Sequence, residues 1–218
     1  NSVKDILSEL KNIIHKSERR KININDPYDT FAWIMDMSDK YNLKNEFYIM
    51  SGHSNWRYDT GYEINNKEIL YLLKEIYNRG HSIGIHPSYN ASNCKNQFYS
   101  QANNLKKVLK SIGIFQEKLG GRMHYLRFHN PQTSINFSES GFSYDSSLGY
   151  AGVPGFRCGT CFEFSLYDQI NNQLLNLRER PLILMEASIL SNEYLGITSF
   201  PEFKNYVKDL KEKCFKVN

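Results

Sequence analysis

The sequence predicts an α/β protein built on a parallel sheet or barrel. Short apolar segments of strand length alternate with longer segments of helical periodicity for most of the 218 residues. Strands joined by helical crossovers run parallel and are buried on both faces, which explains their continuous apolar character. The chain lacks the Gly-x-Gly-x-x-Gly and phosphate-loop patterns, so the sequence disfavours a nucleotide site.

Apolar residues recur every three or four positions in six helical segments. The third segment follows Asn65 and Asn66, either of which is a suitable N-cap, and it closes at Gly80. Gly113 ends the fourth segment and Gly141 ends the fifth. We predict helices over residues 3–14, 31–41, 69–76, 98–112, 134–140 and 203–210.

The predicted strands lie between these helices and are largely apolar. Asn171 and Asn172 indicate a turn between two short extended segments. The apolar run 181–186 indicates a buried strand that ends on the carboxylate of Glu186. The other predicted strands cover residues 46–50, 82–86, 121–128 and 144–148.

Composition and charge limit the molecule to one globular domain. A chain of 218 residues with 40% hydrophobic content can bury one sizeable core, so we expect a single domain over residues 1–218. The net charge of +4 is mild and the basic run 16–21 is short, so no nucleic-acid partner is expected. No apolar run reaches the roughly 18 residues of a membrane span. No signal peptide is visible, and we expect a cytoplasmic protein.

The four cysteines are too few for a disulfide framework in a chain of this length. Cys158 and Cys161 have the C-x-x-C spacing. This spacing fits a redox or zinc pair, but it equally fits two thiols that pack in a loop.

Histidines mark the ends of two predicted strands. His86 closes the strand 82–86 and is followed by Pro87, which fixes the direction of the loop. Catalytic residues of α/β folds lie at such strand ends. His124 shares one face of its predicted strand with Arg122, and buried polar side chains need partners. His124 is therefore a candidate for proton transfer, with a structural, hydrogen-bonded histidine as the alternative.

Five segments resemble the polysaccharide deacetylase superfamily. Gly80–Asn90 resembles its second motif, and the other four resemble a bacterial surface-polysaccharide branch. The resemblance extends from about Asp26 to Glu186, which is most of the chain. The segments are residues 26–31, 80–90, 121–127, 144–150 and 155–161.

The resemblance implies an irregular (β/α) barrel of about seven strands that hydrolyses N- or O-acetyl groups of sugars with a divalent metal, most often zinc. The family's aspartate pair at the end of the first strand has no counterpart here, so we expect that strand upstream of Asn1. No histidine follows His129, so the family's general-acid histidine is also missing. We therefore expect a fragment of a longer chain, with a barrel incomplete at both ends.

The resemblance also implies roles for individual residues. His86 matches a metal ligand, but Asn90 stands where a second histidine is expected, and a neutral amide is a poor zinc ligand. Arg127 matches the arginine that orients the catalytic aspartate. We assign catalysis to Arg127 together with His124 and Glu186. Substrate binding is assigned to Tyr89, Asp145 and Tyr150.

Three functions remain open at this point. The resemblance implies metal-assisted deacetylation of an acetylated glycan. Asn90 suggests a first alternative, metal-independent hydrolysis of a cyclic amide, which the same superfamily includes. The second alternative is a non-catalytic, glycan-binding barrel.

Overall fold

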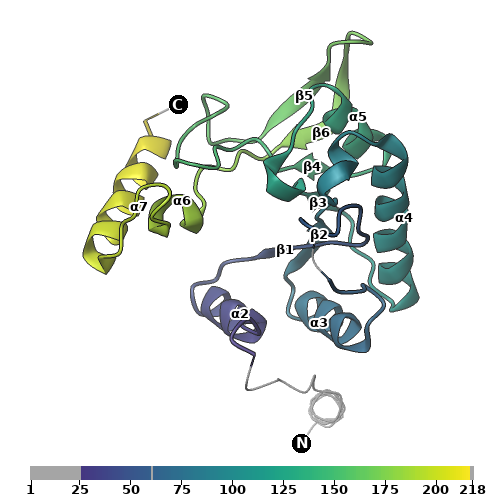
Figure 1. The fold of residues 1–218 in the computed structure, drawn as a ribbon, viewed down its shortest axis with the longest axis horizontal. Helices are drawn as coiled ribbons and strands as arrows, with labels where there is room; N and C mark the ends of the chain where they lie inside the picture. The colour runs from purple at the N-terminus through teal and green to yellow at the C-terminus, as the bar shows by residue number, and fades with distance from the viewer. Residues whose placement is uncertain (1–25, 60, 217–218) are drawn as a thin grey trace, which may run out of the picture.

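A computed structural model describes residues 26–59 and 61–216 of the chain. Its centre is a six-stranded sheet with the strand order β1-β2-β3-β4-β6-β5 (Figure 1). All neighbouring strands run parallel except β5 and β6, which form an antiparallel hairpin. The predicted helix 3–14 lies outside the described residues. The prediction of an α/β protein is confirmed, and the sheet is parallel apart from the β5–β6 pair.

Each strand is short, and the central strands are shortest. Gly120–Gly121 form β3 and Tyr144–Asp145 form β4. The antiparallel hairpin turns at Asn171 and Asn172, as predicted, and Asn172 has a φ of 55°. The other strands are β1 (Glu46–Ile49), β2 (Ser82–Ile85), β5 (Phe164–Asp168) and β6 (Gln173–Glu179).

The predicted helices within the described residues are confirmed. The side chain of Asn66 caps its helix by accepting the N–H of Glu68 at 2.9 Å. Gly80, Gly113 and Gly141 follow three of the helices with positive φ, the conformation in which glycine is favoured. The helices are α2 (Phe31–Lys40), α3 (Lys67–Asn78), α4 (Lys95–Ser111), α5 (Gln132–Glu139), α6 (Glu186–Leu190) and α7 (Phe200–Cys214).

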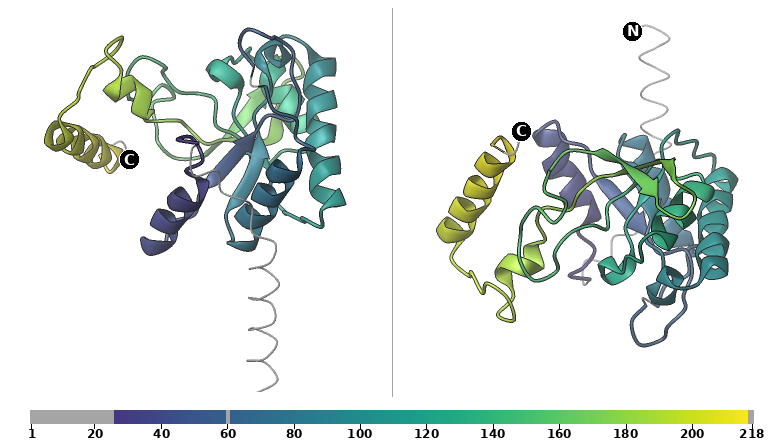
Figure 2. Two further views of the ribbon diagram at one scale, coloured as in Figure 1. Left: turned by 60° about the horizontal axis from the view of Figure 1, so that its bottom comes forward. Right: turned by 90° about the horizontal axis from the view of Figure 1, so that it is seen from above.

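Helices α3, α4 and α5 lie against one face of the sheet and enclose the hydrophobic core (Figure 2). Ile83 and Ile85 of β2 and Leu177 of β6 are buried in this core. Side chains alternate along a strand, so every second residue points to the opposite face of the sheet. This face carries Tyr48, whose hydroxyl donates to Glu46 at 2.7 Å.

Residues 121–128 do not form the predicted strand. After Gly121 the chain makes a short 3-10 turn, η2 (His124–Leu126), in which Tyr125 and Leu126 have positive φ. The N–H of His124 donates to the carbonyl of Pro87 at 3.2 Å, so the chain leaves the sheet beside the end of β2. This contact between two loops is not encoded in the alternation pattern.

Residues 181–186 do not form the predicted strand either. The strand of this region is β6, which ends at Glu179, and the apolar run continues beyond the sheet. Its main chain bonds to loops instead, since Leu182 N–H donates to Leu148 and Gly155 N–H donates to Ile183. Glu186 is exposed and begins α6.

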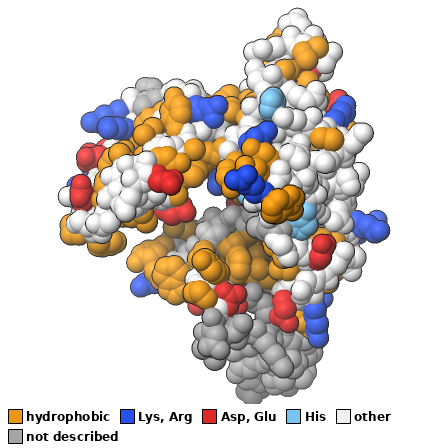
Figure 3. Space-filling view, viewed as in Figure 1, with side chains coloured by type: hydrophobic (Ala, Val, Ile, Leu, Met, Phe, Trp, Pro, Cys, Tyr) orange, Lys and Arg blue, Asp and Glu red, His pale blue; other side chains and the backbone are white. Residues whose placement is uncertain are grey.

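The described residues form an open sheet whose edges are β1 and β5, so the closed barrel of about seven strands stays a prediction. Figure 3 shows hydrophobic side chains on both sides of a hollow between the C-terminal helices and α2. Trp33 of α2 and Phe200 of α7 are 64% and 74% exposed. Within residues 26–59 and 61–216, no helix has the length and apolar character to cross a membrane.

Candidate functional site

Two histidines from neighbouring strand ends meet at the C-terminal edge of the sheet. His86 directly follows β2, and His124 begins the turn after β3. Nε2 of His86 lies 2.9 Å from Nδ1 of His124, and the two rings are nearly perpendicular. The structure thus brings together the predicted metal ligand and a predicted catalytic residue.

The hydrogen bonds of this pair determine how many protons it holds. Nδ1 of His86 faces the carbonyl of Arg122, and Nε2 of His124 faces the carbonyl of Tyr58, each at 2.7 Å. A carbonyl only accepts, so each of these nitrogens carries a proton, and the contact between the rings needs a third. Burial and the neighbouring charge of His124 lower the pKa of His86 to about 4. His86 therefore stays neutral at physiological pH.

Asp59 supplies the negative charge near this pair. Its carboxylate accepts the N–H groups of Ser54 and Asn55 at 2.6 Å and that of Tyr89 at 2.8 Å. Partial burial opposes ionisation, but these hydrogen bonds outweigh it and hold the pKa of Asp59 below its ordinary value. The negative charge of Asp59 partly opposes the lowering of the His86 pKa.

Asn90 is used for structure in the same loop. Its side-chain amide donates to the carbonyl of Ser54 at 3.0 Å, and its N–H donates to the hydroxyl of Ser54 at 2.9 Å. Asn90 therefore ties the loop after β2 to the loop after β1. It takes no part in the contact between the two histidines.

Three tyrosines and one arginine surround the histidine pair. Tyr58 stacks on Tyr89 with ring centroids 4.3 Å apart, and Tyr125 meets both rings edge-on. The guanidinium of Arg127 lies 4.0 Å above the Tyr89 ring and donates to Ser92. Tyr125 is 61% exposed and its ring centroid is 4.6 Å from that of His124. The predicted residues Tyr89 and Arg127 thus lie beside the pair.

The described residues do not fit the expected zinc ion. A protein zinc site uses three or four ligands from histidine, cysteine and carboxylate side chains. Both ring nitrogens of His86 are engaged, by Arg122 and by His124. Among the residues that the structure describes, no three histidine, cysteine or acidic side chains are grouped to hold a metal. The expected zinc on His86 is thus not supported by the described residues.

A buried carboxyl pair lies two strands further along the sheet. Asp145 of β4 and Glu179 of β6 are register partners, and both are fully buried. Within this pair, Oδ2 of Asp145 and Oε2 of Glu179 have no hydrogen-bond partner elsewhere in the described residues. Burial and the negative charge of Asp145 raise the pKa of Glu179 to about 9. Two carboxyl groups in this position share one proton.

The carboxyl pair supports the segment that leads to His124. Asp145 accepts the hydroxyl of Ser147 at 2.6 Å, and that hydroxyl accepts the N–H of Met123 at 2.8 Å. Glu179 accepts the N–H of Leu148 at 3.0 Å. The predicted contact of Asp145 with substrate disagrees with its complete burial. Its observed role is to hold the loop after β4.

Two predicted site residues lie apart from these contacts. Glu186 does not end a strand but starts α6 with an exposed side chain, so the geometry that suggested catalysis is absent. Tyr150 is 47% exposed in the loop after β4, and its assignment to substrate binding stays a prediction.

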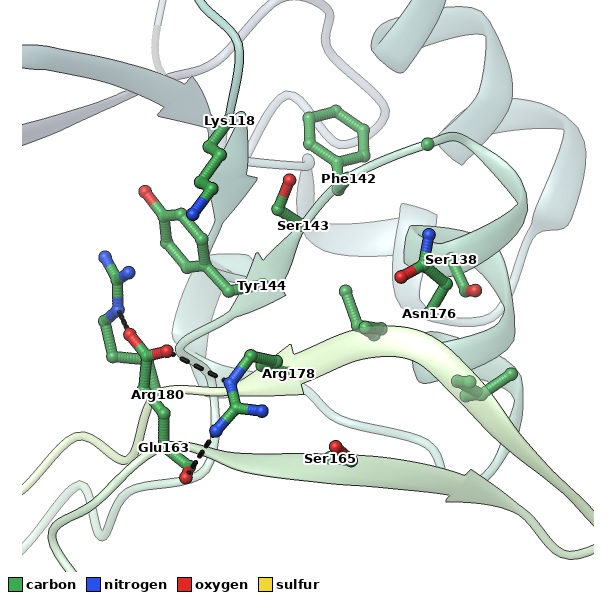
Figure 4. Close-up of a pocket in the computed structure, with 13 residues that line it drawn as sticks. Lys118, Ser138, Phe142, Ser143, Tyr144, Glu163, Ser165, Asn176, Arg178 and Arg180 are labelled. Carbon is green, nitrogen blue, oxygen red and sulfur yellow. Dashed lines mark hydrogen bonds and ion pairs between the residues drawn. The ribbon is translucent and has the colours of Figure 1, made fainter.

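A cavity of about 400 Å³ lies between the segment before β4 and the β5–β6 hairpin. Figure 4 shows Arg178 and Arg180 turned toward the carboxylate of Glu163 from two sides. The amine of Lys118 points toward Tyr144 in the same view. The guanidinium groups are already ion-paired, and neither histidine lines this cavity.

The sequence reasoning missed Tyr58, Asp59 and Glu179. Tyr58 and Asp59 lie in a loop rich in turn-forming residues, where an aspartate usually indicates only a turn. Glu179 ends a strand with an exposed face, in a segment read as a short extended piece. The sequence offered one signal for Glu179. The apolar run 181–186 follows the charged segment Arg178–Arg180 directly, with no turn between them.

Comparison with known proteins supports the fold. No protein-family model and no curated protein matches the chain. A Mycobacterium smegmatis protein assigned as a polysaccharide deacetylase matches in structure with a TM-score of 0.50 and 16% identity, over 72% of this chain and 46% of that one. A chitin deacetylase from the fungus Colletotrichum lindemuthianum matches with a TM-score of 0.35 and 15% identity, over 53% of this chain and 61% of that one. The chain spans about half the length of the first structure, and the likeness shows that the two share a fold.

Proposed function

We propose that the chain removes acetyl groups from acetylated sugars, and that His86 and His124 lie where the reaction occurs. The deacetylase-like fold supports this proposal. The observation that carries it is the hydrogen-bonded histidine pair at the C-terminal edge of a parallel sheet. An imidazole that can give a proton at this edge suits amide or ester hydrolysis, because the leaving group must be protonated.

Nε2 of His124 is the nitrogen that faces the substrate in this proposal. It now donates to the carbonyl of Tyr58 at 2.7 Å, and an acetyl carbonyl is the same kind of acceptor. Once the acetyl oxygen replaces the Tyr58 carbonyl, the N–H polarises it. Water adds its hydroxyl to the acetyl carbon, the bond to the sugar nitrogen or oxygen breaks, and His124 gives its Nε2 proton to the leaving group. The remaining proton of the water passes to Nε2 of His124, which restores its N–H. His86 orients the His124 ring through Nδ1.

The tyrosines beside the pair form the binding surface for the sugar. Tyr125 offers a largely exposed ring next to His124, and Tyr58 and Tyr89 support it from behind. Aromatic rings combine apolar area with a polar tip, which suits a sugar with its apolar ring faces and hydroxyl rim. The partner that fits is an acetylated glycan.

Acetate release tests the proposed reaction. The purified chain is incubated with N-acetylated chito-oligosaccharides, and free acetate is measured over time. Replacing His124 by Ala removes the proton donor, so the rate should fall about 100- to 10,000-fold. The matched control is His129→Ala, because His129 is exposed in a loop. Equal rates in wild type and His124→Ala would contradict the role of the pair.

Glycan binding without hydrolysis is the second candidate function. It is favoured by one observation, that all four ring nitrogens of the pair are already hydrogen-bonded within the protein. Calorimetric titration with the same oligosaccharides separates the two functions. Binding that Tyr125→Ala weakens, without acetate release by wild type, would favour the binding function.

A further inference from the structure

Two cysteines far apart in the sequence lie together where α7 meets the rest of the chain. Cys161 is in the loop before β5, and Cys214 is the last residue of α7, 53 positions later. The Cys161 thiol lies 3.5 Å from the carbonyl oxygen of Cys214. Burial and the neighbouring Cys161 thiol raise the pKa of the Cys214 thiol. We propose that Cys161 and Cys214 form a reversible disulfide that fastens α7 to this loop.

The C-x-x-C spacing suggested a different pair. Cys158 turns toward the carbonyl of Leu148, at 4.0 Å, whereas Cys161 turns toward α7. Gly159, between them, has a φ of 71°, which reverses the chain locally. The structure therefore pairs Cys161 with a residue that the sequence spacing does not indicate. Both thiols of the proposed pair are partly exposed, so a small oxidant can reach them.

The site of this disulfide is loosely packed, which gives the bond a structural effect. Leu210 is the buried residue of α7 within the described chain. A cavity of about 180 Å³ separates α7 from residues 154–156 of the loop. Arg157 of the same loop donates to the carbonyl of Gly149 at 2.9 Å. A covalent link at Cys161 thus connects α7 to the segment that follows β4.

Oxidised glutathione is a suitable oxidant because it is a low-molecular-weight disulfide. The thiolate of one cysteine attacks it, forms a mixed disulfide and releases one glutathione thiolate. The second cysteine then attacks the protein sulfur of the mixed disulfide and releases the second glutathione. The two thiol protons pass to the two glutathione thiolates, the protein sulfurs are oxidised and the glutathione disulfide is reduced. The step is reversible with an excess of reduced thiol.

Peptide mapping of the oxidised chain tests the pairing independently of any enzymatic activity. The full chain is treated with oxidised glutathione, and free thiols and linked peptides are measured by mass spectrometry. Wild type should lose two of its four free thiols and yield a peptide that joins residues 161 and 214. Cys158→Ser and Cys94→Ser are matched controls and should give the same linked peptide. Cys161→Ser and Cys214→Ser should not.

Thermal unfolding provides a second readout. Closing a long loop by a disulfide reduces the freedom of the unfolded chain, so oxidation should raise the Tm of wild type and of Cys158→Ser. It should leave the Tm of Cys161→Ser unchanged, and dithiothreitol should reverse the increase. A linked peptide that joins Cys158 to Cys161, or glutathione adducts without any internal link, would overturn the proposal.

Discussion

The charge state of an acidic side chain in this protein depends strongly on how deeply the side chain is buried. Glu179 and Asp145 are both acidic and adjacent on neighbouring strands, so only one of them can be charged at moderate cost. Their shared proton is retained in the folded chain at a pH where an exposed carboxyl has lost its own. Tyr167 and Arg178 on the same hairpin, by contrast, face solvent.

The carboxyl pair predicts a pH-dependent stability. The pKa of Glu179 is raised on folding, to about 9, so the folded chain holds a proton that the unfolded chain releases. By linkage, the stability is fully present below the ordinary carboxyl pKa and is lost as the pH rises toward 9. The free energy of unfolding should fall by up to about 1.4 kcal/mol per pH unit in this window. Urea unfolding between pH 5 and about 9 measures it.

Glu179→Gln is the diagnostic variant for this prediction. The amide keeps an oxygen for the N–H of Leu148 and adds an N–H for Asp145, and it has no proton to lose. Its stability should therefore change little over the same pH range. Glu193→Gln is the matched control, because Glu193 is exposed, and it should keep the pH dependence of wild type. An unchanged slope in Glu179→Gln would contradict the shared proton.

At the scale of elements, the central strands β3 and β4 pack closely against each other. A Cβ atom on Gly120 would lie 2.0 Å from ring carbons of Tyr144 in the neighbouring strand. The Tyr144 ring cannot shift easily, because the guanidinium of Arg180 lies 3.7 Å from its centroid on the same sheet. Only glycine lets β3 approach β4 in this way.

Gly120→Ala should therefore destabilise the chain. Overpacking at such a site costs about 1–3 kcal/mol of unfolding free energy, which urea unfolding detects. Gly61→Ala is the matched control, because a Cβ at Gly61 would have nothing within 4 Å. Its stability should stay near that of wild type. Similar stability of the two variants would show that Tyr144 has room to move.

Helices were predictable because their signals are local and repeated. Apolar residues recur every three or four positions in α3 and α4, and the caps Asn66 and Gly113 adjoin the helices that they end. Each of these signals belongs to a single helix. The strands β3 and β4 have two residues each, too few for any periodicity, and their position depends on neighbours. His86 and His124 were identifiable as candidates. Their contact was not, because it requires the turn with positive φ at Tyr125.

At the scale of the whole molecule, the open sheet brings the functional groups to one edge. The loops after β1, β2 and β3 supply Asp59, His86 and His124, which come from distant parts of the sequence. This convergence is the general property of parallel sheets. The described part of the chain gathers these hydrogen-bonding groups there, without a set of three metal ligands.

Metal content tests whether the described residues lack a zinc site. Wild type and His86→Ala are dialysed against trace zinc, washed and measured by elemental analysis. Both should contain far less than one zinc per chain, because the described residues offer two imidazoles that bind each other. His129→Ala serves as the control for loss of a surface histidine. Stoichiometric zinc in wild type that disappears only in His86→Ala would contradict the expectation.

The tip of the β5–β6 hairpin is a suitable position for attaching a label or a tag. The carboxylate of Asp168 closes the tip by accepting the N–H groups of Ile170 and Asn171, so the turn is fixed from its base. Asn171 and Asn172 beyond it are exposed, at the edge of the sheet opposite β1. Insertions are best tolerated at exposed loop tips of this kind. A fluorophore or an immobilisation tag placed there would leave the strand ends that carry His86 and His124 uncovered.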